Sequence, residues 1–499
     1  MASLVMLVAL ITVVTGCTST GGQVPDRAGT NRPVEGPNAR PNPRSADNRP
    51  NIVFVLTDDL SANLLRYMPR VRALRKAGSS FTNDFVVDSL CCPSRAAIFT
   101  GEYPHDTGVF DNTAPDGGYR GYNGHHNPRR SFAVALHKSG YRTGFYGKYL
   151  NGYKVRRPPA RGWDDWHVAD NGYPEYDYAL RENGRITRHG HRPADYLTGV
   201  ISRKATRFIE RAAGSGRPFL LEVATFAPHR PATPAPRDVN KFRRLKAPHT
   251  RSFNKPVAHA SRWLRTVPAL SRAEVSRMDE RFRGRVRSVQ AVDRMVGRLR
   301  RQLRALGLAR NTYFVFSSDN GFHLGEHRLR PGKRTAFDTD IRVPLIVAGP
   351  GVPAGRRVTA MTASIDLCPT FEEIAGLRPG KWVDGISLQR LWHGRKVKHP
   401  RKAVLVEHHN SDGRKSNDPD YQANRHGDPP DYAAIRTRRA LYVEYADGER
   451  EYYNLRKDPA ELNNRVRRVP KAKLVTIRAR LHAMQRCHTA ASCRRAASR

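Results

Sequence analysis

Short apolar segments that alternate with longer amphipathic stretches constrain the fold of this chain more than any other feature. Such alternation is typical of a mostly parallel β-sheet whose faces are covered by helices. The expected strands are residues 52–56, 144–146, 219–224, 313–316 and 345–347. The expected helices are residues 69–77, 94–100, 132–138, 198–212, 273–306 and 367–374. We therefore predict an α/β fold.

The pattern changes near residue 395, after which short strands follow one another without long helices between them. They are expected at residues 403–407, 433–436, 440–445 and 451–454, with a closing helix near residues 472–485. We predict a main domain at residues 51–395 and a smaller C-terminal α+β domain at residues 396–499. The Pro- and Arg-rich residues 229–268 are predicted to form a long irregular insertion.

The N-terminus carries a targeting signal. An apolar run at residues 4–14 leads into a Val-Thr-Gly-Cys sequence that ends at Cys17, a pattern that resembles a bacterial lipobox. We predict a signal peptide at residues 1–17, export from a bacterial cell, and lipidation of Cys17. An ordinary cleaved signal and a membrane anchor stay open as alternatives, because the n-region lacks Lys and Arg. Residues 18–50, rich in Gly, Pro, Asn and Ser, are predicted to be a disordered linker.

The chain is strongly basic, with 87 Lys and Arg against 45 Asp and Glu and a net charge of +42. This excess would attract anionic partners such as nucleic acid, an anionic membrane or an acidic polysaccharide. Arg-rich codon usage in a GC-rich genome would produce the same excess without a partner. We find no recognised nucleic-acid module or aromatic-basic platform, so we expect no specific nucleic-acid binding. Contact with a membrane is expected only through the lipid anchor.

The six cysteines are too few for a disulfide scaffold. Cys487 and Cys493 are close enough in sequence for a small loop bridge, which an oxidising compartment would allow. Cys368 is predicted to be a buried apolar residue on a helix. Cys91 and Cys92 precede a Pro-Ser sequence. Taken alone, the pair fits a redox site, a strained vicinal disulfide, or inert core, which is the usual fate of a free cysteine.

Two polar pairs stand directly after predicted strands, where open α/β sheets build their sites. Asp58 and Asp59 follow one strand, and Asp319 and Asn320 follow another. One such pair would fit the cap of the next helix. Two pairs, each closing an apolar strand, favour a cation site of carboxylate and amide oxygens, which suits Ca²⁺ or Mg²⁺ rather than Zn²⁺.

The segment Leu-Cys-Cys-Pro-Ser-Arg at residues 90–95, followed by Thr100-Gly101, is far more specific than a cysteine pair. It resembles the segment in which sulfatases mark one cysteine for oxidation to formylglycine, with Cys91 at the modified position. Segments that agree with the same family are residues 147–149, 227–229, 318–321, 332–334 and 341–345. From about Asn51 to Arg465 the chain is similar to the formylglycine-dependent (type I) sulfatases, most of all to the branch containing N-acetylglucosamine-6-sulfatases.

The resemblance implies an alkaline-phosphatase-like fold, with residues 51–395 as the catalytic domain. The residues that it implies for a divalent cation, Ca²⁺ ahead of Mg²⁺, are Asp58, Asp59, Cys91, Asp319 and Asn320. The catalytic residues that it implies are Cys91 as formylglycine (3-oxoalanine), Arg95, Lys148, His229 and Lys333. His323 and His327, which lie near the second polar pair in sequence, are candidates for substrate contact. The closing motif at residues 453–464 is expected to support the rim of the site.

The family chemistry explains these residue types. Formylglycine hydrates to a diol, of which one hydroxyl attacks sulfur and the other later loses its proton so that sulfate is expelled. Arg95 would orient the diol, and Lys148 and Lys333 would neutralise the sulfuryl group. His229 would protonate the leaving oxygen. Many sulfatases carry a histidine two residues after the strand lysine, but this chain has Leu150 there. The base for sulfate expulsion therefore stays open, with His229 as a candidate for both steps.

The expected activity is hydrolysis of sulfate esters of a sulfated sugar or glycosaminoglycan, such as 6-O-sulfated glucosamine. A formylglycine-generating enzyme is the expected maturation partner. The arginines of residues 229–268 would steer a polyanion. A phosphonate or phosphate ester hydrolase with the same nucleophile is the first alternative, since both groups are tetrahedral anions. A catalytically silent protein that binds acidic glycans is the second, although no nucleophile or ligand is missing. The oligomeric state is left open.

Overall fold

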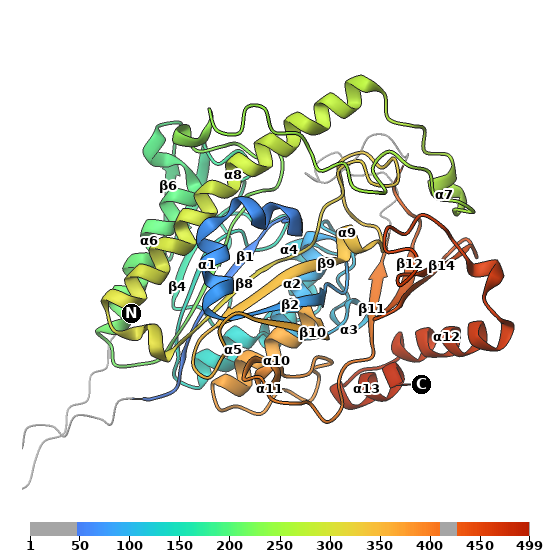
Figure 1. The fold of residues 1–499 in the computed structure, drawn as a ribbon. Coiled ribbons are helices and arrows are strands. Elements are labelled where there is room, and N and C mark those ends of the chain that lie inside the picture. Colours follow the sequence, from blue (N-terminus) through green and yellow to red (C-terminus); the bar gives the residue numbers. More distant parts are fainter. Residues whose placement is uncertain (1–46, 410–426, 499) are drawn as a thin grey trace, which may run out of the picture. The chain divides into compact units, whose positions relative to one another are not determined.

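The computed structural model describes residues 47–409 and 427–498. Its largest element is a ten-stranded sheet (Figure 1). The strands are β1 (Asn51–Thr57), β2 (Ser79–Phe85), β3 (Arg142–Gly147), β4 (Asp165–Ala169), β5 (Tyr178–Glu182), β6 (Arg185–His189), β7 (Phe219–Ala224), β8 (Thr312–Ser318), β9 (Arg342–Ala348) and β10 (Arg356–Ala363). Their order is β10-β2-β9-β8-β1-β7-β3-β4-β5-β6. The central run from β8 to β4 is parallel, whereas β9, β5 and β6 pair antiparallel with their neighbours.

Helices cover both faces of this sheet. The helices of the larger part are α1 (Pro69–Ala77), α2 (Cys91–Thr100), α3 (Pro104–Thr107), α4 (Gly118–Gly124), α5 (Phe132–Lys138), α6 (Leu197–Ala213), α7 (Arg262–Arg265), α8 (Arg272–Ala305), α9 (Asp338–Ile341), α10 (Leu367–Ile374) and α11 (Gln389–Trp392). Short 3-10 helices are η1 (Ala62–Tyr67), η2 (Asn127–Arg130), η3 (Pro193–Asp195), η4 (Pro236–Asp238), η5 (Leu308–Asn311), η6 (Ser364–Asp366) and η7 (Val466–Arg468).

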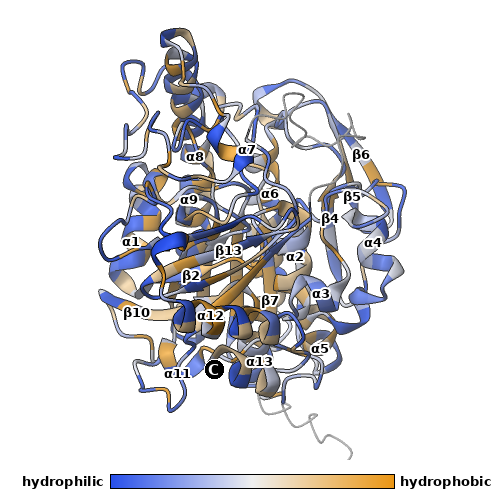
Figure 2. Ribbon diagram, turned by 90° about the vertical axis from the view of Figure 1, so that its right-hand side faces the viewer, coloured by the Kyte–Doolittle hydropathy of each residue, from blue (hydrophilic) through white to orange (hydrophobic). Residues whose placement is uncertain are grey.

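The central strand β1 shows why two helical layers form. All seven of its residues are buried, and successive side chains point to opposite faces. Val53 and Val55 pack in the core with α1, α6 and α8, whereas Ile52, Phe54 and Leu56 pack in the core with α2, α5 and α10. Figure 2 accordingly shows apolar strands inside the molecule and polar outer faces on the helices. Each fully buried side chain of this size contributes roughly 1.5–3 kcal/mol.

The long helix α8 organises one of the two layers. It begins with a capping box in which the Ser271 hydroxyl accepts from the Glu274 amide and the Glu274 carboxylate accepts from the Ser271 amide. Its apolar face packs on α6 and α1. The buried Asp293 carboxylate accepts the backbone N–H groups of Arg70 and Val71 at 2.7 and 3.0 Å. A side chain of α8 thus caps the N-terminus of α1, whose own N-cap residue supplies no side-chain bond.

A second, four-stranded antiparallel sheet follows in the chain. It consists of β11 (Ala403–His408), β12 (Tyr432–Thr437), β13 (Ala440–Tyr445) and β14 (Arg450–Asn454), with helices α12 (Lys471–Met484) and α13 (Ala490–Ser498) beside it. A disulfide joins Cys487 to Cys493. One core cluster, which includes Phe85, Phe337 and Tyr453, connects this sheet with the end of β2 and with α9.

The structure confirms the predicted α/β fold, and each predicted strand and helix overlaps an observed one. Cys368 is buried in α10, as predicted, and Cys487 and Cys493, whose pairing the sequence left open, form a bridge. Within residues 229–268 the helical turns are η4 and α7, which agrees with an irregular insertion. The predicted signal peptide with Cys17 and most of the linker lie outside the described residues, and the domain limits stay predictions. In residues 47–409 and 427–498, no helix is long and apolar enough to cross a membrane.

Candidate active site

Four neighbouring parallel strands end at the same edge of the large sheet, and each leads to polar side chains. The residues are Asp319 and Asn320 after β8, Asp58 and Asp59 after β1, His229 beyond the turn after β7, and Lys148 after β3. All six are buried. The strand order therefore gathers residues that are up to about 260 positions apart in sequence into one cluster.

Cys91 reaches this cluster from the N-terminus of α2. Its Sγ lies 3.1 Å from Asp58 Oδ1 and 3.9 Å from Asp59 Oδ1, and Lys333 Nζ lies 2.8 Å from the same sulfur. The following Pro93 stands in the first turn of α2, where a missing backbone N–H costs the helix little. In a matured sulfatase, an oxygen of the formylglycine residue would take the place of this sulfur.

Ser94 and Arg95 of the same motif hold Asp319 of the second polar pair in place. The Ser94 hydroxyl donates to the backbone carbonyl of Asp319. Arg95 Nε donates to Asp319 Oδ2 at 2.8 Å, and its Nη1 donates to the Lys148 carbonyl at 2.9 Å. Arg95 Nη2 has no hydrogen-bond partner within the described residues. Arg95 therefore fixes the predicted metal site and keeps one buried donor for a further ligand.

The two lysines form buried ion pairs with the first carboxylate pair. Lys148 Nζ lies 2.6 Å from Asp58 Oδ2, and Lys333 Nζ lies 2.5 Å from Asp59 Oδ1. Burial opposes the charge of Lys148, but Asp58 outweighs it and raises the lysine pKa. The Lys148 ammonium group thus stays charged beside Asp58.

The carboxylates and the thiol have strongly shifted pKa values. Burial would raise the pKa of Asp58, but Lys148 and His229 hold it well below its usual range. Burial and the charge of Asp58 raise the pKa of Asp319 to about 6. Burial, together with Asp58, also raises the pKa of Cys91 well above its usual value. An unmodified Cys91 is therefore a neutral thiol at pH 7, which is a poor nucleophile.

The donor set fits a hard divalent cation. Ligand atoms of Asp58, Asp59, Asp319 and Cys91 lie within 4.8 Å of one another. Asn320 Nδ2 donates to Asp59 Oδ1 at 2.7 Å, while its buried Oδ1 has no hydrogen-bond partner among the described residues. An orphaned amide oxygen beside three carboxylates is the environment that oxygen-binding cations require. A cation would also remove the repulsion that raises the pKa of Asp319.

His229 presents one ring nitrogen to this cluster. Its Nδ1 lies 2.7 Å from the Arg230 carbonyl, which only a protonated nitrogen can satisfy. Its Nε2 lies 3.7 Å from Asp59 Oδ2. The ring packs on Tyr173, with 4.5 Å between ring centroids. The hydrogen bond to Arg230 therefore uses Nδ1 and leaves Nε2 on the side of Asp59.

His323 and His327 are held by other partners. His323 Nδ1 lies 2.9 Å from Asp340 Oδ2. His327 Nε2 donates to the Ala460 carbonyl at 2.9 Å. Its ring packs on Phe337, so it faces the closing motif of the chain. Burial lowers the pKa of His327 to about 4. Since a carbonyl oxygen only accepts, Nε2 is the protonated nitrogen of a neutral ring. Contact of either histidine with substrate stays a prediction.

Two residues that the sequence did not single out complete the site. Arg285 of α8 donates from Nη2 to the Asp59 carbonyl at 2.5 Å and from Nη1 to the Pro228 carbonyl at 3.3 Å. The ring of Tyr173 lies 5.0 Å from Lys148 Nζ as well as against His229. In sequence Arg285 is one of many arginines on a helix and Tyr173 stands in an irregular loop, so neither carries a local signal.

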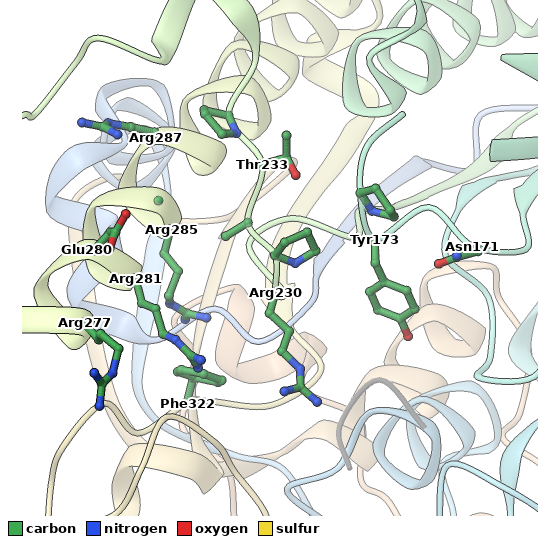
Figure 3. Close-up of a pocket in the computed structure, with 15 residues that line it drawn as sticks. Asn171, Tyr173, Arg230, Thr233, Arg277, Glu280, Arg281, Arg285, Arg287 and Phe322 are labelled. Carbon is green, nitrogen blue, oxygen red and sulfur yellow. The ribbon is translucent and has the colours of Figure 1, made fainter. Parts of the chain in front are cut away.

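A cavity of about 850 Å³ opens beside this cluster (Figure 3). Its lining includes Tyr173, Arg230 and Arg285, each of which contacts the cluster or follows a residue of it. Through Tyr173 and Arg285, which contact His229, Lys148 and the Asp59 carbonyl, the cavity adjoins the buried cluster.

Comparison with known proteins defines the class. The profile of the family described as "Sulfatase" matches residues 50–377, and the profile described as "N-sulphoglucosamine sulphohydrolase, C-terminal" matches residues 325–487. The chain belongs to the sulfatase family. It is an enzyme that hydrolyses sulfuric esters.

Particular relatives narrow this class. The N-acetylglucosamine-6-sulfatase of Homo sapiens is 34% identical over 473 residues, which cover 88% of this chain and 85% of the relative. Among solved structures, BT4656 in complex with its substrate D-glucosamine-2-N,6-O-disulfate has a TM-score of 0.73 at 23% identity, covering 90% of this chain and 98% of that chain. A phosphonate monoester hydrolase from Silicibacter pomeroyi has a TM-score of 0.66 at 22% identity, covering 88% and 96%. Both structures have the same fold as this chain. The sequence match favours a sulfatase over the alternatives considered above.

Proposed function

We propose that this enzyme removes the 6-O-sulfate from N-acetylglucosamine residues of a sulfated glycan. The observation that carries the proposal is the buried cluster in which Cys91 lies between Asp58 and Lys333. The similarity to N-acetylglucosamine-6-sulfatase over 88% of the chain supports the sugar, and the glucosamine disulfate bound by BT4656 agrees with it. Heparan and keratan fragments carry such groups.

The nucleophile of the proposed reaction derives from Cys91. Formylglycine at this position supplies a hydrated aldehyde that attacks sulfur and later releases sulfate without a second attack at sulfur. The buried lysines Lys148 and Lys333 offset the charge that develops on the transferring sulfuryl group. Arg95 holds Asp319 and would use its remaining buried donor, Nη2, for the substrate or the diol.

The proton for the leaving sugar oxygen comes from His229. Its Nδ1–H is held by the Arg230 carbonyl, so the second nitrogen, Nε2, faces the site and carries the transferable proton in the imidazolium form. Leu150 is buried at the position where many sulfatases have a histidine. We therefore assign the proton transfer in sulfate expulsion to His229 as well.

The metal of the proposed site is a divalent cation, with Ca²⁺ favoured over Mg²⁺. Asp58, Asp59, Asp319, the amide oxygen of Asn320 and the modified Cys91 would hold it. Bound there, it would acidify the attacking hydroxyl and bind a sulfate oxygen. Carboxylate-rich, flexible oxygen sites suit Ca²⁺ better than Mg²⁺, which keeps several waters.

Export and maturation complete the proposal. We propose that residues 1–17 are a lipoprotein signal peptide, that Cys17 is lipidated, and that residues 18–50 tether the enzyme to a bacterial cell surface. A formylglycine-generating enzyme would act on Cys91. Replacing Cys17 by Ser should release the enzyme from the membrane fraction, and equal membrane retention of both forms would contradict the anchor.

The proposed substrate is tested by assaying matured enzyme on three matched sugars. We expect sulfate release from N-acetylglucosamine 6-sulfate at a kcat/KM at least ten-fold above that for galactose 6-sulfate and for release of phosphate from N-acetylglucosamine 6-phosphate. The Cys91→Ala variant should release nothing while its circular dichroism spectrum stays that of the wild type. Preference for the phosphate ester or for galactose 6-sulfate would contradict the proposal.

A further inference from the structure

The cavity beside the active site is lined by an unusual group of arginines (Figure 3). Arg277, Arg281 and Arg285 extend from α8 on one side, and Arg230 and Tyr173 stand on the other. Glu280 is the one acidic side chain in the lining within the described chain. The cavity therefore carries a strong positive charge.

Arg277 and Arg281 differ from the other two α8 arginines of the lining, Arg285 and Arg287, whose side chains donate to backbone carbonyls. In the described residues, neither Arg277 nor Arg281 has a hydrogen bond or an ion pair from its side chain. By contrast, Arg294 pairs with the Asp238 carboxylate. Burial, together with the nearby charges of Arg230 and Arg277, lowers the pKa of Arg281. Like charges that repel one another at a cavity wall are stabilised by an anionic ligand.

The arginines are connected with the reacting groups. Arg230 directly follows His229, and its carbonyl holds the histidine ring at 2.7 Å. Tyr173 lines the cavity and also packs on His229. Two residues of the cavity wall thus also contact His229 of the site. Arg277 and Arg281 are exposed, but unlike other exposed arginines of α8, such as Arg301 and Arg304, they line the cavity that Tyr173 and Arg285 share.

We propose that this cavity binds a second anionic group, a sulfate or a carboxylate, of a sulfated oligosaccharide whose 6-O-sulfate lies at Cys91. The proposal rests on the proposed function and extends it from the sugar that reacts to a neighbouring sugar of the chain. Guanidinium groups bind sulfates and carboxylates through paired hydrogen bonds. A monosulfated monosaccharide has no second anion, so it gains nothing from Arg277 and Arg281.

The test compares two substrates in matched variants. We would measure kcat/KM on N-acetylglucosamine 6-sulfate and on a multiply sulfated tetrasaccharide ending in the same sugar. In the double variant Arg277→Gln, Arg281→Gln, the ratio of tetrasaccharide to monosaccharide kcat/KM should fall at least ten-fold. The control Arg301→Gln, Arg304→Gln removes the same charge from exposed positions of α8 and should leave that ratio within two-fold of the wild type.

Equal loss on both substrates, or an unchanged ratio, would overturn the proposal. Keratan-type fragments, which carry sulfates but no uronate, and heparan-type fragments, which carry both, distinguish sulfate from carboxylate as the second anion. If the wild type cleaves no 6-O-sulfated sugar, the proposed function fails by itself. In that case we would measure binding of the tetrasaccharide to the Cys91→Ala protein. Adding Arg277→Gln and Arg281→Gln must lower this affinity at least ten-fold for the inference to stand.

Discussion

Asp59 adopts a left-handed backbone conformation, with φ at 63°, at the centre of the candidate site. A residue with a side chain pays on the order of 1 kcal/mol or more for such a conformation. Three contacts hold it there: its amide donates to Asp319 Oδ1 at 3.1 Å, its carbonyl accepts from Arg285, and its carboxylate meets Lys333. The turn aims both the Asp58 and the Asp59 carboxylate at Cys91.

At the same scale, we predict that the rate lost on replacing His229 depends on how easily the leaving group departs. The His229→Gln variant should lose 10² to 10⁴ in kcat on N-acetylglucosamine 6-sulfate, because a sugar alkoxide leaves poorly without a proton. On 4-nitrophenyl sulfate, whose phenolate leaves unaided, the loss in the sulfuryl-transfer step should be ten-fold or less, which burst-phase kinetics resolve. Equal losses in that step on both substrates would show that His229 does not protonate the leaving oxygen.

Removing the metal tests whether the Asn320 amide oxygen is one of its ligands. After chelation the enzyme should lose activity, and Ca²⁺ should restore more of it than Mg²⁺ at equal concentration. Ca²⁺ at one hundred times its Kd should stabilise the fold by about 2.7 kcal/mol. The Asn320→Ala variant should need at least ten-fold more Ca²⁺ for the same increase in Tm. Full activity after exhaustive chelation, or unchanged Ca²⁺ affinity in Asn320→Ala, would contradict the assigned ligand set.

At the scale of elements, strand order explains both what the sequence predicted and what it missed. β1 and β8 are continuous apolar runs, so their ends and the polar pairs beyond them could be read from the sequence. β2 and β10 carry many polar and charged residues and become strands only by pairing with each other and with β9. Their strand character depends on long-range contacts, which no local pattern contains.

The site was predicted to a similar limit. Motifs marked Lys148, His229 and Lys333, and the structure brings all three to the Cys91 cluster. Arg285 escaped notice because its role comes from where α8 crosses the sheet edge, which the helix sequence does not encode locally. The family resemblance implied that Arg95 orients the diol. The structure shows in addition that Arg95 donates a hydrogen bond to Asp319.

The junction between α3 and β11 should make stability depend on pH. His105 of α3 bonds Glu407 of β11 at 2.7 Å and the Cys487 carbonyl at 2.8 Å. Burial opposes its charge, but these partners outweigh burial and raise the pKa of His105 from 6.5 to about 9. A raised histidine pKa stabilises the fold fully below pH 6.5 and loses this contribution as the pH rises through about 9.

The matched comparison is wild type against His105→Gln, with urea unfolding measured from pH 6 to pH 9.5. The stability difference between them should be largest near pH 6 and should shrink steadily toward pH 9.5. A pH-independent difference would mean that His105 is not charged in the folded protein. Burial raises the pKa values of Glu102 and Asp384 to about 8 and the charge of His105 lowers both, so the difference includes their coupling to His105.

At the scale of the whole molecule, a net charge of +42 surrounds a site that is itself rich in carboxylates. Long-range attraction of a polyanion would then depend on the protein surface, whereas binding of one sulfate would depend on the buried lysines. Salt screens exposed charges beyond about 10 Å at 0.1 M but affects buried pairs far less.

This difference predicts two salt dependences. Raising the NaCl concentration from low millimolar to about 0.5 M should lower kcat/KM on a multiply sulfated tetrasaccharide by ten-fold or more. On N-acetylglucosamine 6-sulfate the decrease should be three-fold or less, and kcat at saturation should change little for either substrate. Parallel decreases for the two substrates would show that the basic surface does not assist binding of polyanions.

The central claim is that Cys91 becomes the nucleophile by oxidation, and one mass spectrum addresses it. Trypsin cleaves after Lys76 and after Arg95, and no Lys or Arg lies between them. Residues 77–95 are therefore released as a single peptide. In active enzyme from a host with the maturation machinery, fragmentation of this peptide should locate formylglycine at Cys91 and unmodified cysteine at Cys92. Fully active enzyme in which this peptide carries only unmodified cysteine at position 91 would contradict the account.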